Sequence, residues 1–288
     1  MLYITYTLNF LLMLALPFAL AAYLARRLGT RWGLIWAGAV SFIGSQIVHQ
    51  PLGVLLTNLG LFKPAASGWP LVIYAAELGL WAALCEELAR YLVLRFWLKR
   101  DRSWRSALMF GAGHGGTESF IMGLMAAAAA INLFVARSVD PARLGVTPDQ
   151  RAAVQARVAA AFAVPVLYPL TGAYGRVTAL AAHMFLAVLV MQVFLRRNIL
   201  WLAAAIFWHA LTDGLTTYVQ RAYASAPYGI YLTETVITLL AIIGVILIFR
   251  LRQLEPLPVD AAPAAAAPPL APLPPPPVDD QPHRTKYD

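Results

Sequence analysis

Seven long stretches of this chain are almost entirely apolar, and a helix that crosses a membrane needs about 20 such residues. The stretches cover residues 2–25, 32–56, 70–98, 105–135, 178–195, 199–220 and 228–250. Because 60% of the residues are hydrophobic and only 12% are charged, the composition excludes a soluble domain. The sequence therefore predicts an all-α bundle of about seven transmembrane helices. We expect it in a lipid bilayer, as a multi-pass protein of a bacterial-type plasma (inner) membrane.

Basic residues follow alternate apolar stretches, and lysine and arginine accumulate on the cytoplasmic side of membrane proteins. The four clusters are Arg26/Arg27/Arg31, Lys99/Arg100/Arg102/Arg105, Arg196/Arg197 and Arg250/Arg252. Placing all four inside predicts an N-terminus outside and a C-terminus inside. It also explains the net charge of +8 without a nucleic-acid partner. Residues 2–25 lack a preceding basic region, which favours a retained span. Ala19-Leu20-Ala21 leaves a cleaved signal peptide as the alternative.

Two regions lie outside this pattern. Residues 136–177 are expected to form a long outer loop of the membrane domain 1–252, although they carry several arginines. Within that loop, residues 152–168 are rich in alanine and valine and predict a helix on the membrane surface, with an eighth span as the alternative. Residues 253–288 are rich in proline and alanine and cannot bury a core. They predict a disordered cytoplasmic tail.

Charged and histidine side chains occur inside the apolar stretches, where each costs roughly 3 kcal/mol at the centre of a membrane helix. They are Glu86, Glu87, Arg90, His114, Glu118, His183, His209 and Asp213. Counted at about 1.5 Å per residue from the predicted cytoplasmic helix ends, Glu86, Glu118, Asp213 and the three histidines lie about 14 to 21 Å deep. Convergence at one depth near the middle of the bilayer predicts a functional site.

Helical spacing groups the first three of these residues. Arg90 lies one turn from both Glu86 and Glu87, so its guanidinium can reach either carboxylate. One interpretation is a structural ion-pair knot that holds helices together. The other is a functional site, because two carboxylates and one arginine leave a negative charge that a metal ion would neutralise.

Two of the three histidines also have a carboxylate one turn away, in the pairs His114/Glu118 and His209/Asp213. Such a carboxylate can be a second metal ligand, or it can fix the tautomer of the histidine. Imidazoles and carboxylates are the ligands of metal-dependent hydrolases. The single cysteine, Cys85, excludes both a zinc–thiolate cluster and an internal disulfide.

Glycines surround His114 in the segment 111–116. Gly111 and Gly115 fit close helix packing. A second interpretation, compatible with the first, is a backbone opened beside the site to admit water or substrate. Other polar residues of the apolar stretches lie nearer the predicted outer ends, where we expect them to face the surface or an outer cavity. These residues are Gln46, His49, Glu77 and Glu234.

The ordered set Glu86-Glu87-x-x-Arg90, Gly113-His114-Gly115-Gly116-x-Glu118, His183 and His209-x-x-x-Asp213 resembles the YhfC family of intramembrane metalloproteases. The motifs cover roughly residues 70–215. The wider group includes CAAX prenyl proteases, PrsW-type proteases and the APH-1 scaffold of gamma-secretase. CAAX proteases typically space the arginine one residue further from the glutamates, and they have Asn where this chain has Asp213. CAAX substrate specificity is therefore not carried over.

The residues and the resemblance together lead to a metal-dependent intramembrane endopeptidase as the first hypothesis. His114, His183 and His209 would bind the metal, expected to be zinc, with Asp213 or Glu118 as a further ligand. Glu86 would be the general base toward a metal-activated water, Glu87 would assist or ligate, and Arg90 would orient both glutamates. The expected substrate is a membrane-embedded or lipid-anchored peptide, and other membrane proteins are possible partners.

Two other functions remain open at this point. The sequence spacing between His183 and His209 also resembles that of the histidine pair in APH-1, whose members are described as non-proteolytic. A catalytically silent membrane scaffold is therefore the main alternative. A proton or ion transporter could use the same acidic residues as a relay. Such a transporter predicts internal repeats with broken helices, and the sequence contains no convincing repeat.

Overall fold

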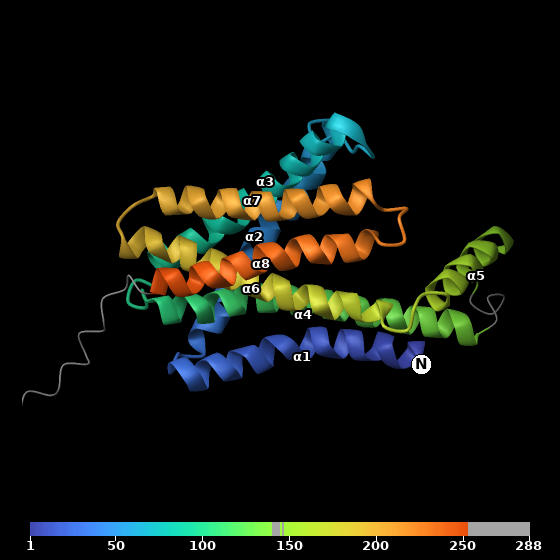
Figure 1. The fold of residues 1–288 in the computed structure, drawn as a ribbon, viewed down its shortest axis with the longest axis horizontal. Coiled ribbons are helices and arrows are strands. Elements are labelled where there is room, and N and C mark those ends of the chain that lie inside the picture. The colour runs from blue at the N-terminus through green and yellow to red at the C-terminus, as the bar shows by residue number, and fades with distance from the viewer. Residues whose placement is uncertain (140–144, 146, 253–288) are drawn as a thin grey trace, which may run out of the picture. The chain divides into compact units, whose positions relative to one another are not determined.

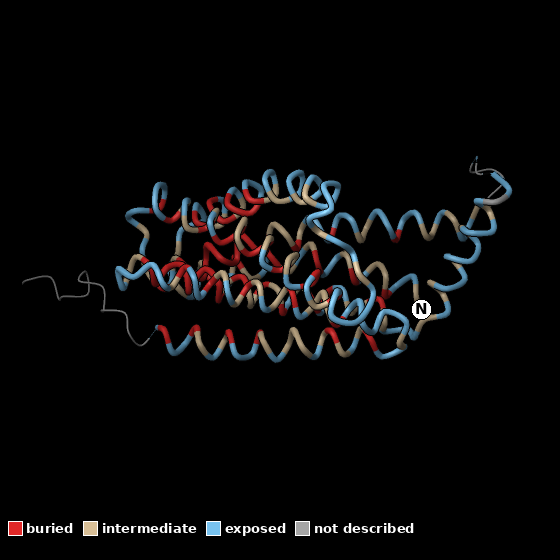
Figure 2. Tube along the Cα trace, turned by 90° about the horizontal axis from the view of Figure 1, so that it is seen from above, coloured by how far each residue is buried: buried red, intermediate tan, exposed pale blue. Residues whose placement is uncertain are grey.

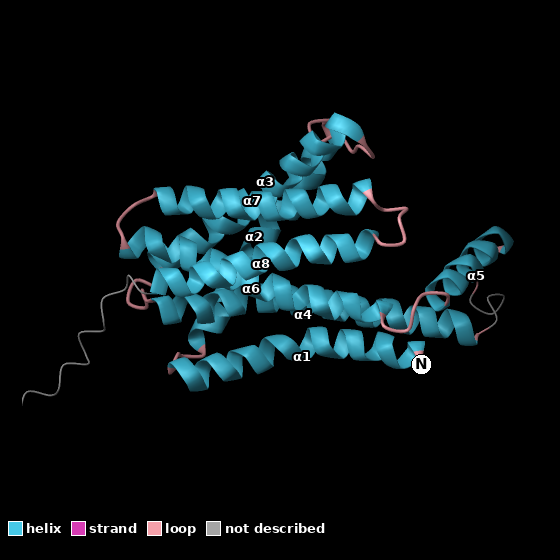
Figure 3. Ribbon diagram, viewed as in Figure 1, coloured by secondary structure: helices cyan, strands magenta, loops and turns pink. Residues whose placement is uncertain are grey.

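A computed structural model describes residues 1–139, 145 and 147–252, and all regular structure within them is helical (Figure 3). The helices are α1 (Leu2–Leu28), α2 (Gly33–Asn58), α3 (Gly68–Phe96), α4 (Trp104–Ser138), α5 (Pro148–Phe162), the short 3₁₀-helix η2 (Tyr168–Leu170), α6 (Thr171–Leu195), α7 (Leu200–Ala222) and α8 (Gly229–Arg252). This confirms the predicted fold class. The predicted tail, residues 253–288, lies outside the described residues.

Six of these helices are long and apolar enough to cross a membrane: α1, α2, α3, α4, α8, and α6 together with η2. The predicted seventh span, α7, has 23 residues but is less apolar because it carries His209 and Asp213. It packs along α3 and also contacts α8 and α6 (Figure 1). The helix α5 has only 15 residues, about 22 Å at 1.5 Å per residue, which is too short for an eighth span.

The segment 136–177 contains more helix than the sequence predicted. The helix α6 begins at Thr171 instead of near residue 178. Arg176 in the second turn of α6 is paired with Glu118 of α4 at 2.8 Å, so its charge is matched inside the bundle. The Asn9 side chain accepts a hydrogen bond from the Ala173 backbone at 2.7 Å. These two contacts with other helices explain why α6 starts earlier than its polar sequence suggested.

The helix α6 lies at the centre of the described bundle. In its apolar window 67% of residues are buried, against 17 to 33% in the other five candidate spans. Figure 2 shows the buried residues gathered in the inner helices and the exposed residues along the outer ones. Phe110 of α4 and Phe185 and Met191 of α6 belong to the hydrophobic core. The central position of α6 places His183 among the other helices that carry polar residues.

Glycines let neighbouring helices cross with their backbones in contact. A Cβ atom on Gly38 of α2 would lie 2.2 Å from the Phe110 carbonyl oxygen, and one on Gly113 of α4 would lie 2.3 Å from the Ile35 carbonyl oxygen. Gly79 of α3 meets the backbone of Ala210 in α7 in the same way. Small residues at helix crossings are typical of membrane bundles, where packing drives association. These crossings bring α2, α3, α4 and α7 close enough to share one site.

Contacts between helix ends bring the four basic clusters to one end of the bundle. Arg31 pairs with Asp101 at 2.7 Å, which joins the first cluster to the second. The Arg102 guanidinium lies 4.3 Å from the ring centre of Phe194, beside the third cluster. Arg252 of the fourth lies 4.9 Å from the Trp104 ring centre. The assignment of this end to the cytoplasm remains a prediction from the charge rule.

We predict that Gly38→Ala destabilises the bundle by about 1 to 3 kcal/mol, because its new methyl group must displace the α4 backbone. Gly44→Ala is the matched control in the same helix, since a Cβ atom there meets nothing within 4 Å. The control should leave stability unchanged or raise it by up to about 1 kcal/mol through helix propensity. Thermal unfolding in detergent measures both, and equal melting temperatures would refute the packing argument.

Candidate metal centre

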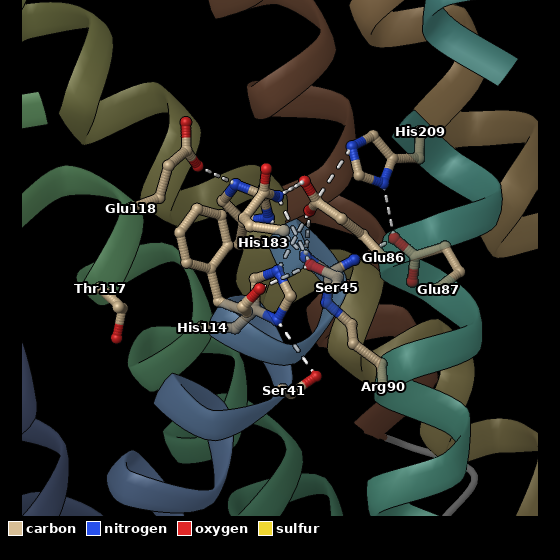
Figure 4. Close-up of polar contacts among 12 residues, drawn as sticks. Ser41, Ser45, Glu86, Glu87, Arg90, His114, Thr117, Glu118, His183 and His209 are labelled. Atoms are coloured by element: carbon tan, nitrogen blue, oxygen red, sulfur yellow. Dashed lines mark hydrogen bonds and ion pairs between the residues drawn. The ribbon is translucent and has the colours of Figure 1, made fainter. Parts of the chain in front are cut away.

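Four helices bring the predicted site residues together (Figure 4). Glu86, Glu87 and Arg90 come from α3, His114 and Glu118 from α4, His183 from α6, and His209 and Asp213 from α7. Among them, Glu86, Glu87, Arg90, His114, His183 and His209 are buried. The convergence predicted from depth alone is therefore present in the fold.

Arg90 lies at the base of the cluster and is completely buried. Its Nη1 pairs with Glu87 Oε1, and its Nη2 lies 3.4 Å from Glu86 Oε2. The same Nη2 donates to Nδ1 of His183 at 2.6 Å. Because a buried guanidinium must have partners to offset its desolvation, these contacts fix the relative positions of α3 and α6.

Glu86 lies between the imidazoles. Its Oε2 is 3.1 Å from Nε2 of His114 and 3.9 Å from Nε2 of His209. Its other oxygen, Oε1, accepts a hydrogen bond of 3.1 Å from the Gln46 side chain of α2. Two ring nitrogens from different helices therefore face one carboxylate oxygen.

The opposite ring nitrogens of two histidines contact groups that can hold their orientation. His114 Nδ1 lies 3.3 Å from the Ser41 hydroxyl. His209 Nδ1 lies 2.6 Å from Glu87 Oε1. A histidine that donates Nδ1–H to such a partner keeps Nε2 as a free ligand atom, which is the arrangement of many metal-binding histidines. Asp213 also lies 3.3 Å from His209 Nε2, but its side chain is 42% exposed.

His183 has both ring nitrogens engaged. An arginine can only donate, so Nδ1 of His183 accepts from Arg90, and the proton of the neutral ring is on Nε2. This Nε2–H donates to Glu118 Oε2 at 2.5 Å. Glu118 is held in turn by Arg176 at 2.8 Å. Ligation of a metal by His183 requires one of its two contacts to be given up.

Three residues meet the geometric requirement for a shared ion within the described part of the chain. Glu86, His114 and His183 each offer a ligand atom, and these atoms lie within 4.8 Å of one another. The His209 ring centre is 6.0 Å from that of His183. Imidazole nitrogens and carboxylate oxygens are ligands that zinc accepts. The donor set therefore fits a divalent metal, while Glu118 and Asp213 contact the outer edges of the histidines.

The charge of the cluster also favours a bound cation. The buried carboxylates of Glu86 and Glu87 face one buried guanidinium, Arg90. One negative charge is left over in this group, and a bound cation would neutralise it. Glu87 Oε2 is also buried without a hydrogen-bond partner among the described residues. Buried charge without compensation is costly, so this surplus favours cation binding.

Sequence reasoning missed three members of the cluster. Gln46, expected near an outer helix end, bonds to Glu86. Ser41 contacts His114, and Arg176, expected in a loop, pairs with Glu118. A polar residue inside an apolar stretch was the available signal for Gln46. No sequence signal distinguishes Ser41, because serine is common in membrane helices.

The interpretation of residues 111–116 as an opened backbone is wrong. The helix α4 is continuous from Trp104 to Ser138. A Cβ atom on Gly111 would lie 2.7 Å from Cα of Met184, and one on Gly115 would lie 2.7 Å from the His183 ring. The glycines are needed for close packing of α4 on α6, and Gly115 leaves the space that the His183 ring occupies.

We predict that Arg90→Met lowers stability by about 3 to 5 kcal/mol, because it leaves Glu87 buried without its cation. The control is Arg31→Met, which breaks a pair whose arginine side chain is 74% exposed, and it should cost less than about 1 kcal/mol. Thermal unfolding in detergent compares the two variants. Similar melting temperatures would show that Arg90 does not hold the helices together.

Comparison with known proteins identifies the family of the chain. The chain matches the family described as "YhfC intramembrane metalloprotease" over residues 12–236. It is 27% identical over 240 residues to a protein from Bacillus subtilis (strain 168) named "Uncharacterized membrane protein YhfC". That alignment covers 83% of this chain and 92% of the relative. No solved structure matches the chain.

The family match spans every helix that supplies the cluster, from α2 through α7. It includes the glutamate pair and Arg90 as well as the three buried histidines. A match of this extent covers well over half of the sequence. The chain is thus a multi-pass membrane protein that belongs to the YhfC intramembrane metalloprotease family.

Proposed function

We propose that the protein is a metal-dependent intramembrane endopeptidase that hydrolyses membrane-embedded or lipid-anchored peptides. The observation that carries the proposal is a buried cluster in which ligand atoms of Glu86, His114 and His183 lie within 4.8 Å of one another. The family to which the chain belongs supports the same reaction class. A bound zinc ion would supply Lewis acidity, which makes water a better nucleophile and polarises a peptide carbonyl.

His114, His183 and His209 are the proposed ligands. His114 and His209 would contribute Nε2, because their Nδ1 atoms contact Ser41 and Glu87. His183 would contribute Nδ1, because its Nε2–H is held by Glu118. Arg90 would then be held by its two glutamates alone. In this arrangement Glu118 orients His183, and Asp213 lies at the exposed edge of His209.

Glu86 is the proposed general base. Its Oε2 faces Nε2 of His114 and Nε2 of His209, which places a proton acceptor beside the atoms that would hold the metal. Glu87 is completely buried and is engaged by Arg90 and His209. It therefore serves as a positioning residue. The split between the two glutamates follows from their different surroundings, although they are neighbours in the sequence.

An apolar groove supports a peptide substrate within the membrane. The groove lies between α3 and α7, has a volume of about 480 Å³, and is lined by residues that include Ala75, Ala210 and Gly214. Its α7 residues are sequence neighbours of His209 and of the partly exposed Asp213. An apolar segment of a substrate could lie there with its backbone near the cluster.

A transporter is less well supported. Transporters of the inverted-repeat type place discontinuous helices at the binding site. The helices α3, α4, α6 and α7 are continuous and lack internal proline after the first turn, and α2, which supplies Ser41 and Gln46, is continuous across Pro51. The cluster is thus built from side chains on intact helices.

We predict that the detergent-purified protein contains one zinc ion per chain, and that His114→Ala and His209→Ala both lose it. Glu86→Gln should keep the metal and lose hydrolysis by at least 100-fold, because the amide cannot accept the proton. Metal content is measured by elemental analysis. Cleavage of a library of transmembrane peptides in micelles is followed by mass spectrometry.

Thermal unfolding of each variant controls for loss of fold. A folded wild type that takes up no zinc would overturn the proposal and favour a silent scaffold. Loss of zinc in Glu86→Gln would instead make Glu86 a ligand and exclude it as the general base.

Glu118→Gln should weaken zinc binding by about 10- to 100-fold without abolishing it, as expected for a residue that orients a ligand. Competition with a zinc chelator gives the change in affinity. Glu234→Gln is the control, because this partly buried carboxylate lies on α8 and makes no hydrogen bond or ion pair with a histidine among the described residues. Complete loss of zinc in Glu118→Gln would make Glu118 a direct ligand.

A further inference from the structure

A row of residues on α2 leads away from Glu86 toward the end of the bundle where α2 joins α3. The row contains Gln46, His49, Gln50, Gly53 and Thr57. Steps of three and four residues place them on one helical face. Hydrolysis consumes water, yet the cluster is buried within an apolar bundle. The row is a candidate for the path by which water arrives.

Hydrogen bonds connect the inner part of this row to the site. Gln46 donates from Nε2 to Glu86 Oε1 at 3.1 Å. Its own oxygen lies 3.1 Å from His49 Nδ1 and 3.0 Å from Gln50 Nε2. The chain of polar groups thus extends from the proposed general base along more than one turn of α2. It runs away from the basic end of the bundle, where α2 begins beside Arg31.

The outer part of the row opens into a hollow between α2 and α3. This cavity has a volume of about 280 Å³, and its lining includes His49, Gly53, Thr57 and Trp81. Trp81 of α3 donates its indole N–H to the His49 carbonyl oxygen at 3.2 Å. Gly53 keeps the hollow open, since even a Cβ atom there would lie 3.3 Å from the Trp81 ring nitrogen.

The opposite face of α2 is apolar and exposed. Val48 and Leu55 are apolar, and 52% and 48% of their surfaces are exposed, as expected for contact with lipid tails. Among the described residues, His49 Nε2 makes no hydrogen bond, although polar groups in hydrocarbon cost several kcal/mol when unpaired. Water in the hollow would satisfy it. Helix α2 therefore has one polar face toward the site and one apolar face toward lipid.

We propose that Gln46, His49, Gly53 and Thr57 line a water path that connects Glu86 with the α2–α3 end of the bundle, the predicted outer side of the membrane. The path supplies the water for hydrolysis, and in this respect it rests on the proposed function. Its existence as a hydrated path can be tested without any activity, because water-filled and lipid-facing positions differ in reactivity toward charged reagents.

The experiment uses single-cysteine variants of the full chain in which the native Cys85 is replaced by Ala. His49→Cys and Gly53→Cys probe the path, and Val48→Cys and Leu55→Cys are matched controls at similar depth on the lipid face. A charged, membrane-impermeant methanethiosulfonate is added to spheroplasts or to inside-out vesicles. A C-terminal tag with a protease site reports the orientation.

We expect the two path cysteines to react at least tenfold faster than the controls, and only from the side opposite the C-terminus. Adding Gly53→Phe to the His49→Cys variant should slow its modification at least tenfold by filling the hollow, whereas Leu55→Phe should not. Equal reactivity on both faces, modification only from the C-terminal side, or no effect of Gly53→Phe would overturn the water path. Zinc binding is measured in the same preparations, so failure of the metal site and failure of the path are distinguishable.

Discussion

The buried ion pair between Arg90 and Glu87 is the interaction on which the rest of the site depends. A guanidinium in a membrane bundle is tolerated only where carboxylates and hydrogen-bond acceptors surround it. Arg90 finds them on its own helix in Glu86 and Glu87, and on α6 in His183. Because the buried guanidinium needs these partners, two carboxylates and one imidazole lie next to one another.

Around this pair, each histidine is held by a group from another helix. His114 contacts Ser41 of α2, His183 contacts Glu118 of α4, and His209 contacts Glu87 of α3. Such cross-helix contacts restrict ring rotation before any ligand binds, which lowers the cost of ordering a metal site. The glycine crossings act together with these contacts, because only a close approach of the backbones lets short side chains span the gap.

Burial of the site creates a second requirement that the bundle must meet. Exclusion of water strengthens electrostatic interactions within the cluster, yet the proposed hydrolysis would need one water molecule for each bond broken. The polar face of α2 would meet this need, and its apolar face would contact lipid. The helix serves as a wall of the site and, in the proposed path, as its connection to solvent. Peptide access from the bilayer would use the separate groove between α3 and α7.

The sequence by itself determined the membrane class, the helical fold, and the glutamates, Arg90, histidines and Asp213 of the cluster. Apolar length and helical spacing are local properties, and they sufficed to pair Glu86 and Glu87 with Arg90 and to place the three histidines at one depth. The tertiary structure alone decided which residues touch across helices. Gln46 reaches Glu86, Arg176 holds Glu118, and α6 starts earlier than its polar residues suggested, because each depends on a partner more than 35 positions away. The tertiary structure also decided the different surroundings of the two glutamates. They are adjacent in the chain, but a rotation of 100° about the helix sends Glu87 toward Arg90 and His209 and leaves Glu86 facing the ring nitrogens.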